Sequence, residues 1–240
     1  MSPGSGRRFA GVHSRLMNNL IYYYEFDEES GNRVDRSPNN LTLTDNATVG
    51  FAAGMLGNAA DFESGNSEYF SRASEALLQM GDIDCAWAGW IRFETVGVRQ
   101  MVLAKDDVAG REYAFEFRGA AADRLQITIW DGGVNNSVVA SDFGDLLANT
   151  WYFWYSYHDA VNNEIGISIN DGTVTTFTTT IAPSVTNTEF QLGARLYGGF
   201  RDFFDGRQDL TGFWKRLLLP SEVTFLYNGG LGRSYADIIR

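Results

Sequence analysis

The stretch that decides the fold lies at residues 204–230 and reads Phe204-Asp205-Gly206-Arg207-Gln208-Asp209-Leu210-Thr211-Gly212-Phe213-Trp214-Lys215-Arg216-Leu217-Leu218-Leu219-Pro220-Ser221-Glu222-Val223-Thr224-Phe225-Leu226-Tyr227-Asn228-Gly229-Gly230. Within it, side chains at positions 210, 212, 214 and 216 alternate with those at positions 211, 213 and 215. A period of two residues is typical of a β-strand, because successive side chains point to opposite faces of a sheet. The stretch therefore predicts a strand that runs through Trp214.

A short helix is predicted directly after this strand. Ser221, which follows Pro220, is a natural N-cap because its hydroxyl can accept a hydrogen bond from a free backbone N–H of the first turn. Asn228 followed by Gly229 supplies the left-handed conformation that ends many helices. We therefore expect a helix of one to two turns between these two signals.

The rest of the chain carries almost no helical periodicity. Short runs rich in Val, Ile, Thr and aromatic residues are separated by clusters of Gly, Asn and Asp, which is the pattern of an all-β sandwich. At 240 residues with 44% hydrophobic content, the chain suits one large β domain, and no linker rich in Pro, Gly or Ser divides it. We expect a domain at residues 20–232, an N-terminal arm at residues 1–19 and a C-terminal tail at residues 233–240.

A series of motifs resembles the laminin-G-like, concanavalin A-like jelly-roll domains of the lectin/glucanase superfamily. The resemblance rests on the closing strand and helix and on segments at residues 20–31, 35–40, 57–62, 84–91, 150–152 and 165–172. Among them, Asp84-Cys85-Ala86-Trp87-Ala88-Gly89-Trp90-Ile91 matches a core strand, and Ile165-Gly166-Ile167-Ser168-Ile169-Asn170-Asp171-Gly172 matches a central hairpin. Pro38 stands where the family usually has Gly. The resemblance implies a two-sheet antiparallel jelly-roll β-sandwich with twelve or more strands and one short C-terminal helix, in a family used mostly for recognition and assembly.

Charge and hydropathy argue against several kinds of partner. The formal net charge of −11 argues against nucleic acid, since binding to duplex phosphates needs clustered Lys and Arg. The longest apolar run, residues 20–24, is far too short to span a bilayer, so we expect no membrane insertion.

Cys85 is the only cysteine, and we interpret it as a buried, inert thiol. Because secreted animal members of the family often carry a disulfide, its absence favours folding in a reducing cytosol.

A run of carboxylates near the N-terminus raises the question of catalysis. Jelly-roll glucanases use a Glu-x-Asp-x-Glu strand, which Glu25, Asp27 and Glu29 resemble. A retaining glycosidase needs its two carboxyl groups about 5–5.5 Å apart, and positions i and i+4 of a strand are farther apart than that without a bulge. The turn signal Ser30-Gly31 follows at once. We therefore expect these carboxylates to be solvated or structural. We predict that the protein has no catalytic residues and no enzymatic activity.

An aromatic loop between two predicted strands is the first candidate binding feature. Its residues are Tyr197, Phe200, Arg201 and Phe203, and Trp130 forms a second rim feature. Exposed rings of this kind would stack on sugar faces or anchor a protein partner, and Arg beside aromatic residues is a common interface composition. Most other aromatic residues fall in predicted strands, and we interpret those as core.

Calcium is the second binding question. Many members of the family hold Ca²⁺ at a rim of the sandwich, and this ion prefers oxygen ligands from Asp side chains and loop carbonyls. Asp35 and Asp205 are the first residues to test, because both are expected in turns. Asp also favours turns for its own backbone hydrogen bonds, and no dense Asp-x-Asp-x-Asp loop is present. We therefore predict no metal site and no cofactor, with calcium as the alternative.

The N-terminal arm is predicted to contact a neighbouring subunit. Its polar, basic and Gly-containing sequence cannot bury enough apolar surface to fold alone. The cations and apolar residues that would pair with or insert into the partner are Arg7, Arg8, Phe9, Val12, Arg15, Leu16 and Met17.

Two classes of function remain. The first is a non-enzymatic virion subunit, a bacteriophage capsid decoration or tail protein that is assembled in the host cytoplasm and binds other virion proteins and copies of itself. This reading is favoured by the resemblance to stand-alone jelly rolls of tailed-phage structural proteins, and by a single recognition-type domain that starts at Met1. The alternative is a carbohydrate-binding adhesion module that acts on glycans at the cell surface or outside the cell.

Overall fold

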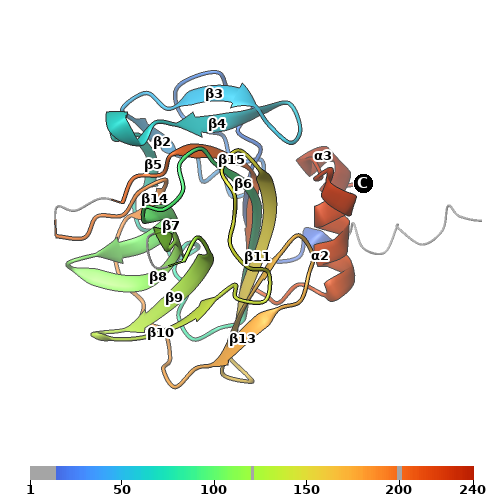
Figure 1. The fold of residues 1–240 in the computed structure, drawn as a ribbon. Helices are drawn as coiled ribbons and strands as arrows, with labels where there is room; N and C mark the ends of the chain where they lie inside the picture. Colours follow the sequence, from blue (N-terminus) through green and yellow to red (C-terminus); the bar gives the residue numbers. More distant parts are fainter. Residues whose placement is uncertain (1–14, 120–121, 199–201) are drawn as a thin grey trace, which may run out of the picture.

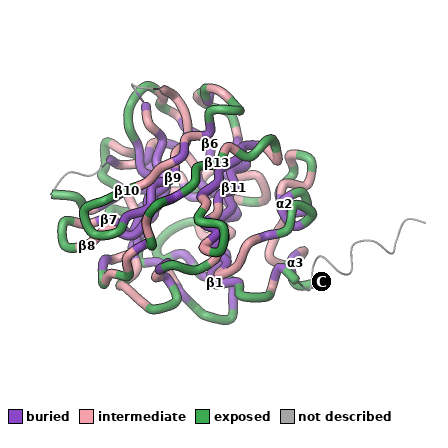
Figure 2. Tube along the Cα trace, turned by 90° about the horizontal axis from the view of Figure 1, so that it is seen from below, coloured by how far each residue is buried: buried purple, intermediate pink, exposed green. Residues whose placement is uncertain are grey.

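The computed structural model describes residues 15–119, 122–198 and 202–240 (Figure 1). Fifteen strands in these ranges form two antiparallel sheets with an apolar core between them. The predicted all-β jelly-roll sandwich with twelve or more strands is therefore confirmed. Figure 2 shows that the strands form the buried interior while the connecting loops are mostly exposed.

The larger sheet, called the β6 sheet below, is made of eight strands. They are β1 (Leu20–Tyr24), β3 (Gly50–Ala53), β4 (Asn58–Phe62), β6 (Cys85–Phe93), β11 (Trp151–Asp159), β12 (Glu164–Ile169), β13 (Thr175–Thr178) and β15 (Gly206–Trp214). Their order is β13-β12-β11-β6-β15-β4-β3, and β1 also pairs with β15. The predicted central hairpin is present as β11 and β12, and the predicted closing strand lies in the middle of the sheet as β15.

The smaller sheet, called the β8 sheet, has seven strands. They are β2 (Thr44–Asn46), β5 (Tyr69–Arg72), β7 (Gln100–Asp107), β8 (Gly110–Phe117), β9 (Leu125–Asp131), β10 (Val134–Val139) and β14 (Phe190–Leu192). Their order is β10-β9-β8-β7-β14-β5-β2. Each sheet therefore has one face toward the shared core and one outer face on which a site can be built.

Helical segments are short and lie mostly at the C-terminal end. They are η1 (Ser64–Asn66), α2 (Pro220–Tyr227), η3 (Asn228–Gly230) and α3 (Tyr235–Ile238). Helix α2 confirms the predicted helix, but its N-cap is Leu219, whose N–H donates to the Glu222 carboxylate at 2.7 Å. The prediction of Ser221 as N-cap is wrong, because Pro220 already occupies the first helical position, where its missing N–H is not needed. Asn228 ends the helix as predicted, with φ of 51°.

None of the helices in the described ranges has the length and apolar character to cross a membrane.

Aromatic side chains from both sheets fill the main core. Trp87 of β6 stacks on Phe213 of β15, with ring centroids 4.8 Å apart, and meets Phe115 of β8 across the sandwich at 5.2 Å. Cys85 is a buried free thiol in the same core, and burial raises the pKa of this thiol well above its usual range. The predicted burial of Cys85 in the core is thus confirmed.

A second apolar layer covers part of the outer face of the β6 sheet. Trp214 and Phe153 point away from the main core and pack with side chains of α2 and α3. In Figure 1 these two helices lie together on one side of the molecule, beside the β6 sheet. The closing strand therefore serves two layers, with Phe213 facing inward and Trp214 facing outward.

The described part of the expected N-terminal arm packs on its own domain. Leu16 is fully buried in the outer layer, and its carbonyl accepts a hydrogen bond from the Trp214 indole at 2.7 Å. Met17 packs against the same layer, and the Arg15 carbonyl accepts a hydrogen bond from Arg216 at 2.7 Å. Leu16 is thus not free to anchor in a neighbouring subunit, because its apolar surface is already used. The other predicted arm residues, Arg7, Arg8, Phe9 and Val12, lie outside the described residues.

The expected C-terminal tail is also part of the packed domain. Ile238 of α3 is fully buried in the outer layer. The Tyr23 hydroxyl of β1 donates to the Arg233 carbonyl at 2.6 Å. The packed chain therefore continues beyond the predicted boundary at residue 232.

Candidate functional site

Two of the predicted binding aromatics meet on the outer face of the β8 sheet. Trp130 of β9 is 4% exposed, whereas Tyr197, in the loop after β14, is 41% exposed. Arg111 of β8 lies near both rings, with its guanidinium carbon 4.0 Å from the Trp130 centroid and 4.7 Å from that of Tyr197. Sequence reasoning missed Arg111, since only the sheet pairing brings it between these rings. Because Trp130 is buried under this cation, its ring is not free to stack on a ligand.

The other members of the predicted aromatic loop are placed differently. Phe203 packs against Tyr69 of β5, with ring centroids 6.2 Å apart, rather than against Trp130. Phe200 and Arg201 lie outside the described residues. The structure thus brings together Trp130 and Tyr197 but not Phe203.

Charges on this outer face are matched within the protein. Arg111 pairs with Asp106 at 2.6 Å, and Arg195 pairs with Asp202 at 2.8 Å. Arg99 continues the series through Glu116, next to a hollow of about 230 Å³ that also involves Arg118 and Gln126. Because most of these cations already have a carboxylate partner, we interpret the network mainly as a device that holds the loop after β14 on the sheet.

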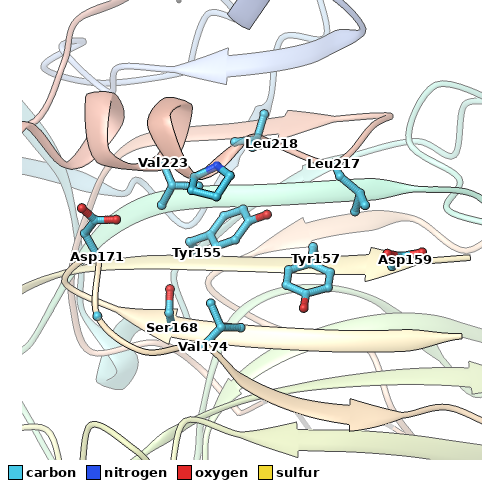
Figure 3. A pocket seen from close by; sticks show the side chains of 11 residues that line it. Tyr155, Tyr157, Asp159, Ser168, Asp171, Val174, Leu217, Leu218 and Val223 are labelled. Carbon is cyan, nitrogen blue, oxygen red and sulfur yellow. The ribbon is translucent and has the colours of Figure 1, made fainter. Parts of the chain in front are cut away.

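A larger hollow of about 430 Å³ lies on the outer face of the β6 sheet. Figure 3 shows it running along β11, between the start of α2 on one side and β12 with the turn toward β13 on the other. The outer apolar layer covers the neighbouring part of this face but leaves the hollow open beside Tyr155 and Tyr157. The predicted hairpin segment and the closing segment supply part of its lining, but the sequence did not indicate a site here.

The Tyr157 ring forms the floor of the hollow. Strand alternation points Tyr157 outward, and its partner across the strand pair on β12 is Gly166. A Cβ atom added to Gly166 would lie 2.4 Å from the Tyr157 ring, so the ring lies directly across the glycine backbone. The Tyr157 hydroxyl donates to the Glu164 carboxylate at 2.5 Å, which holds the far end of the ring. The result is a flat aromatic surface whose other face is turned toward the hollow (Figure 3).

Tyr155 continues this surface toward α2. Its ring centroid is 5.8 Å from that of Tyr157, with 35° between the ring planes. Burial raises the pKa of both tyrosine hydroxyls well above the usual range, and the Glu164 carboxylate raises that of Tyr157 further. Both hydroxyls therefore stay protonated at any ordinary pH.

Polar groups stand at the two ends of the hollow. Asp159 ends β11, and its carboxylate accepts hydrogen bonds from the backbone and side-chain N–H groups of Asn162, both at 2.8 Å. Asp171 lies at the opposite end, in the turn after β12 (Figure 3), and the Ser168 hydroxyl lies beside the floor. Asn170 fixes this turn by exchanging two hydrogen bonds with the backbone of β11, at 2.8 and 3.0 Å.

An apolar wall closes the side toward α2. It is formed by Leu217, Leu218, Pro220 and Val223. The wall is held by Arg216, which binds both oxygens of the buried Glu222 carboxylate at 2.7 and 2.8 Å. Because Glu222 also caps α2, one ion pair fixes both the loop and the first turn of the helix.

The carboxylates considered for catalysis lie elsewhere and have structural partners. Strand β1 ends before them, so they do not share one strand face. Glu25 accepts a hydrogen bond from the Tyr235 N–H at 2.8 Å, and Asp27 accepts one from the Asn58 N–H at 3.0 Å. Glu29 is exposed in the following bend. This placement agrees with the expected structural or solvated roles.

The two aspartates suggested for calcium bind backbone groups. Asp35 is buried, and its carboxylate accepts hydrogen bonds from the N–H groups of Tyr23 at 3.0 Å and Leu41 at 2.9 Å. Asp205 accepts hydrogen bonds from the N–H and hydroxyl of Ser64, at 3.2 and 3.0 Å. Among the residues that the structure describes, no group of three or more His, Cys, Asp or Glu is placed to hold a metal ion. The described geometry thus gives both aspartates the local role that Asp often has in turns.

Comparison with known proteins agrees with the fold. Residues 64–224 match the family model described as the Concanavalin A-like lectin/glucanases superfamily. None of the curated proteins matches the chain significantly in sequence.

Three solved structures with a similar fold are binding domains or domains of larger proteins. The binding domain of Paraclostridial Mosquitocidal Protein 1 has a TM-score of 0.71 and 15% identity, over 90% of this chain and 53% of that one. Domain 4 of AbnA, an extracellular GH43 arabinanase from Geobacillus stearothermophilus solved with arabinotriose, has a TM-score of 0.65 and 19% identity, over 90% and 98%. The binding domain of Botulinum Neurotoxin DC in complex with SialylT has a TM-score of 0.67 and 11% identity, over 90% and 52%. The chain thus spans about half the length of the two toxin domains, and at these identities the likeness shows the fold alone.

Proposed function

We propose that this chain, which belongs to the concanavalin A-like lectin/glucanases superfamily, is a non-catalytic carbohydrate-binding module. The observation that carries the proposal is the Tyr157 ring, laid flat across Gly166 on the floor of a hollow of about 430 Å³. Such a ring packs against the apolar C–H face of a sugar, while polar groups at the rim bind its hydroxyls. The hollow has these rim groups in Asp159, Ser168 and Asp171.

The compared structures support this class of ligand. Domain 4 of AbnA was solved with arabinotriose, and the neurotoxin domain was solved with SialylT. In those two proteins, domains of this fold were solved with a saccharide, and we propose the same class of ligand for this chain.

We extend the proposal to location as well: the module would act outside the cell or at its surface, as part of the extracellular arabinanase does.

We rank this function above the virion subunit that the sequence favoured. Two of the three structures described above are binding domains. One of the expected assembly anchors, Leu16, is buried in its own domain. Saccharides therefore replace virion proteins and copies of this chain as the proposed partners.

The test is a loss of saccharide binding in Tyr157→Ala. We expect the wild-type protein to bind at least one member of a panel of neutral oligosaccharides that includes arabinotriose, and Tyr157→Ala to weaken that binding at least tenfold, or about 1.4 kcal/mol. Tyr157→Phe keeps the ring but loses the hydrogen bond to Glu164, so its affinity should lie between those of the wild type and Tyr157→Ala. Isothermal titration calorimetry would follow a glycan array, with circular dichroism to confirm folding.

Tyr197→Ala is the matched control. This variant removes an exposed tyrosine on the other sheet and should leave the affinity unchanged. Absence of binding to every saccharide in the panel would reject the proposed function. Loss of binding in Tyr197→Ala but not in Tyr157→Ala would instead move the site to the β8 sheet.

A further inference from the structure

We infer that the hollow on β11 selects neutral saccharides and rejects those that carry a carboxylate, such as uronic or sialic acid residues. This inference rests on the proposed function and names the class of ligand for the same site. Three observations support the inference. They are the negative charges around the floor, the hydrogen-bonding capacity of the rim, and the lack of an available cation among the described residues beside the hollow.

Negative charge surrounds the floor without compensation. The lining of the hollow contains two acidic side chains, Asp159 and Asp171, and no Lys or Arg. A third carboxylate, Glu164, holds the Tyr157 hydroxyl. None of these three carboxylates forms an ion pair with a residue in the described ranges, whereas most of the arginines on the outer face of the β8 sheet are paired. A ligand carboxylate in the hollow would be repelled more strongly than in bulk water, because the partly enclosed space screens charges less.

The rim also favours ligands that donate hydrogen bonds. An ionised carboxylate accepts hydrogen bonds and donates none. Asp171 makes no side-chain hydrogen bond within the described residues, and Asp159 is held in place by Asn162 while keeping unused lone pairs. Sugar hydroxyls supply the donors that both groups lack. Where a carboxylate takes the place of a hydroxyl, the ligand presents an acceptor to these acceptors, and this mismatch discriminates between the two ligands.

The arginine that directly precedes the apolar wall is fully occupied. This residue is Arg216, and each of its five N–H donors has an acceptor. The acceptors are both oxygens of Glu222 and the carbonyls of Arg15, Asn18 and Leu217. Arg216 therefore has no donor left for a ligand carboxylate. Arg118, for which no carboxylate partner is found among the described residues, lies on the outer face of the β8 sheet, beside the smaller hollow.

The experiment compares neutral oligosaccharides with counterparts that carry one or more carboxylates. The array would pair lactose with sialyllactose and galactotriose with trigalacturonate, together with arabinotriose and further neutral and uronate pairs. We expect the carboxylated member of each bound pair to bind at least tenfold more weakly. In the double variant Asp159→Asn/Asp171→Asn this difference should shrink to less than threefold. Glu29→Gln, which removes a negative charge at an exposed position outside the lining, should leave the difference unchanged.

Two outcomes would overturn the inference in distinguishable ways. Equal or tighter binding of the carboxylated member by the wild-type protein, with Tyr157→Ala still weakening it, would reject the selection for neutral sugars but keep the proposed function. Failure to bind any saccharide would reject the proposed function, and the inference with it.

Discussion

Replacement of Asp209 by Asn is expected to stabilise the protein at neutral pH by several kcal/mol. Asp209 of β15 is completely buried. One carboxylate oxygen accepts hydrogen bonds from the N–H groups of Met55 at 2.7 Å and Leu56 at 3.2 Å, and the other has no partner in the described structure. Burial raises the pKa of this carboxyl group to about 8, although the backbone donors lower it. An amide keeps an oxygen for the two donors and is neutral without binding a proton, so it avoids the cost of keeping Asp209 protonated in a place where a charge is costly to bury.

The sign of the pH dependence follows from this raised pKa. In the unfolded chain the pKa of an Asp is about 3.9, so between about pH 4 and pH 8 the unfolded state releases a proton that the folded state keeps. Wild-type stability should therefore fall as the pH rises through this window, by up to about 1.4 kcal/mol per pH unit from this group. Below the window both states are protonated and the penalty vanishes.

Urea unfolding of wild type and Asp209→Asn across this window would measure the effect. The two proteins should be similar near pH 4, and the variant should become progressively more stable toward pH 8. Parallel pH profiles for the two proteins would show that Asp209 is ionised in the folded state and would contradict this account.

Removal of either partner of the buried Lys105–Glu112 pair is expected to cost about 3–5 kcal/mol, because the remaining charge would be buried without compensation. The two side chains are fully buried, and the ammonium nitrogen lies 3.2 Å from a carboxylate oxygen. Lys105 also donates to the Thr188 carbonyl at 2.8 Å, and Glu112 accepts from the N–H groups of Met80 at 3.0 Å and Thr186 at 2.7 Å. The pair thus ties the loop after β5 and the segment before β14 to the β7–β8 hairpin.

Lys105→Met and Glu112→Gln would test this, each alone and combined. We expect each single variant to lose several kcal/mol in denaturant unfolding and the double variant to lose less than their sum, which is the signature of a direct interaction. The matched control is Arg124→Met. Its pair with Asp145 is closer, at 2.7 Å, but both side chains are partly exposed, so the loss should stay below about 1 kcal/mol. If Lys105→Met costs no more than Arg124→Met, the buried pair has no such role.

The fold was more predictable from sequence than the site was. Alternation around Phe213 and Trp214 predicts the closing strand because the two residues serve different apolar layers. The bulge in this strand was not predictable, since Leu210 takes a φ of 47°, which the alternating pattern of a strand does not indicate. The burial of Leu16 was not predictable either. In the sequence Leu16 belongs to a polar arm, and only the folded β6 sheet provides the apolar layer that buries it.

Tyr157 illustrates why the binding site needed three-dimensional information. In sequence it is one of several strand aromatics, and these were interpreted as core. Its role depends on Gly166, which lies opposite it on the next strand, and on Glu164, which holds its hydroxyl. Trp130 and Tyr197 were found by residue type alone, and type alone does not reveal that Arg111 covers one of them.

The most direct test of the central claim is an NMR titration of the ¹⁵N-labelled protein with the neutral oligosaccharide that binds best. We predict that amide shift changes concentrate along β11 and β12, at Tyr157, Gly166 and Ser168, and at the start of α2 around Val223. Shift changes confined to the outer face of the β8 sheet, around Trp130 and Tyr197, would contradict the assignment of the saccharide site to the hollow on β11.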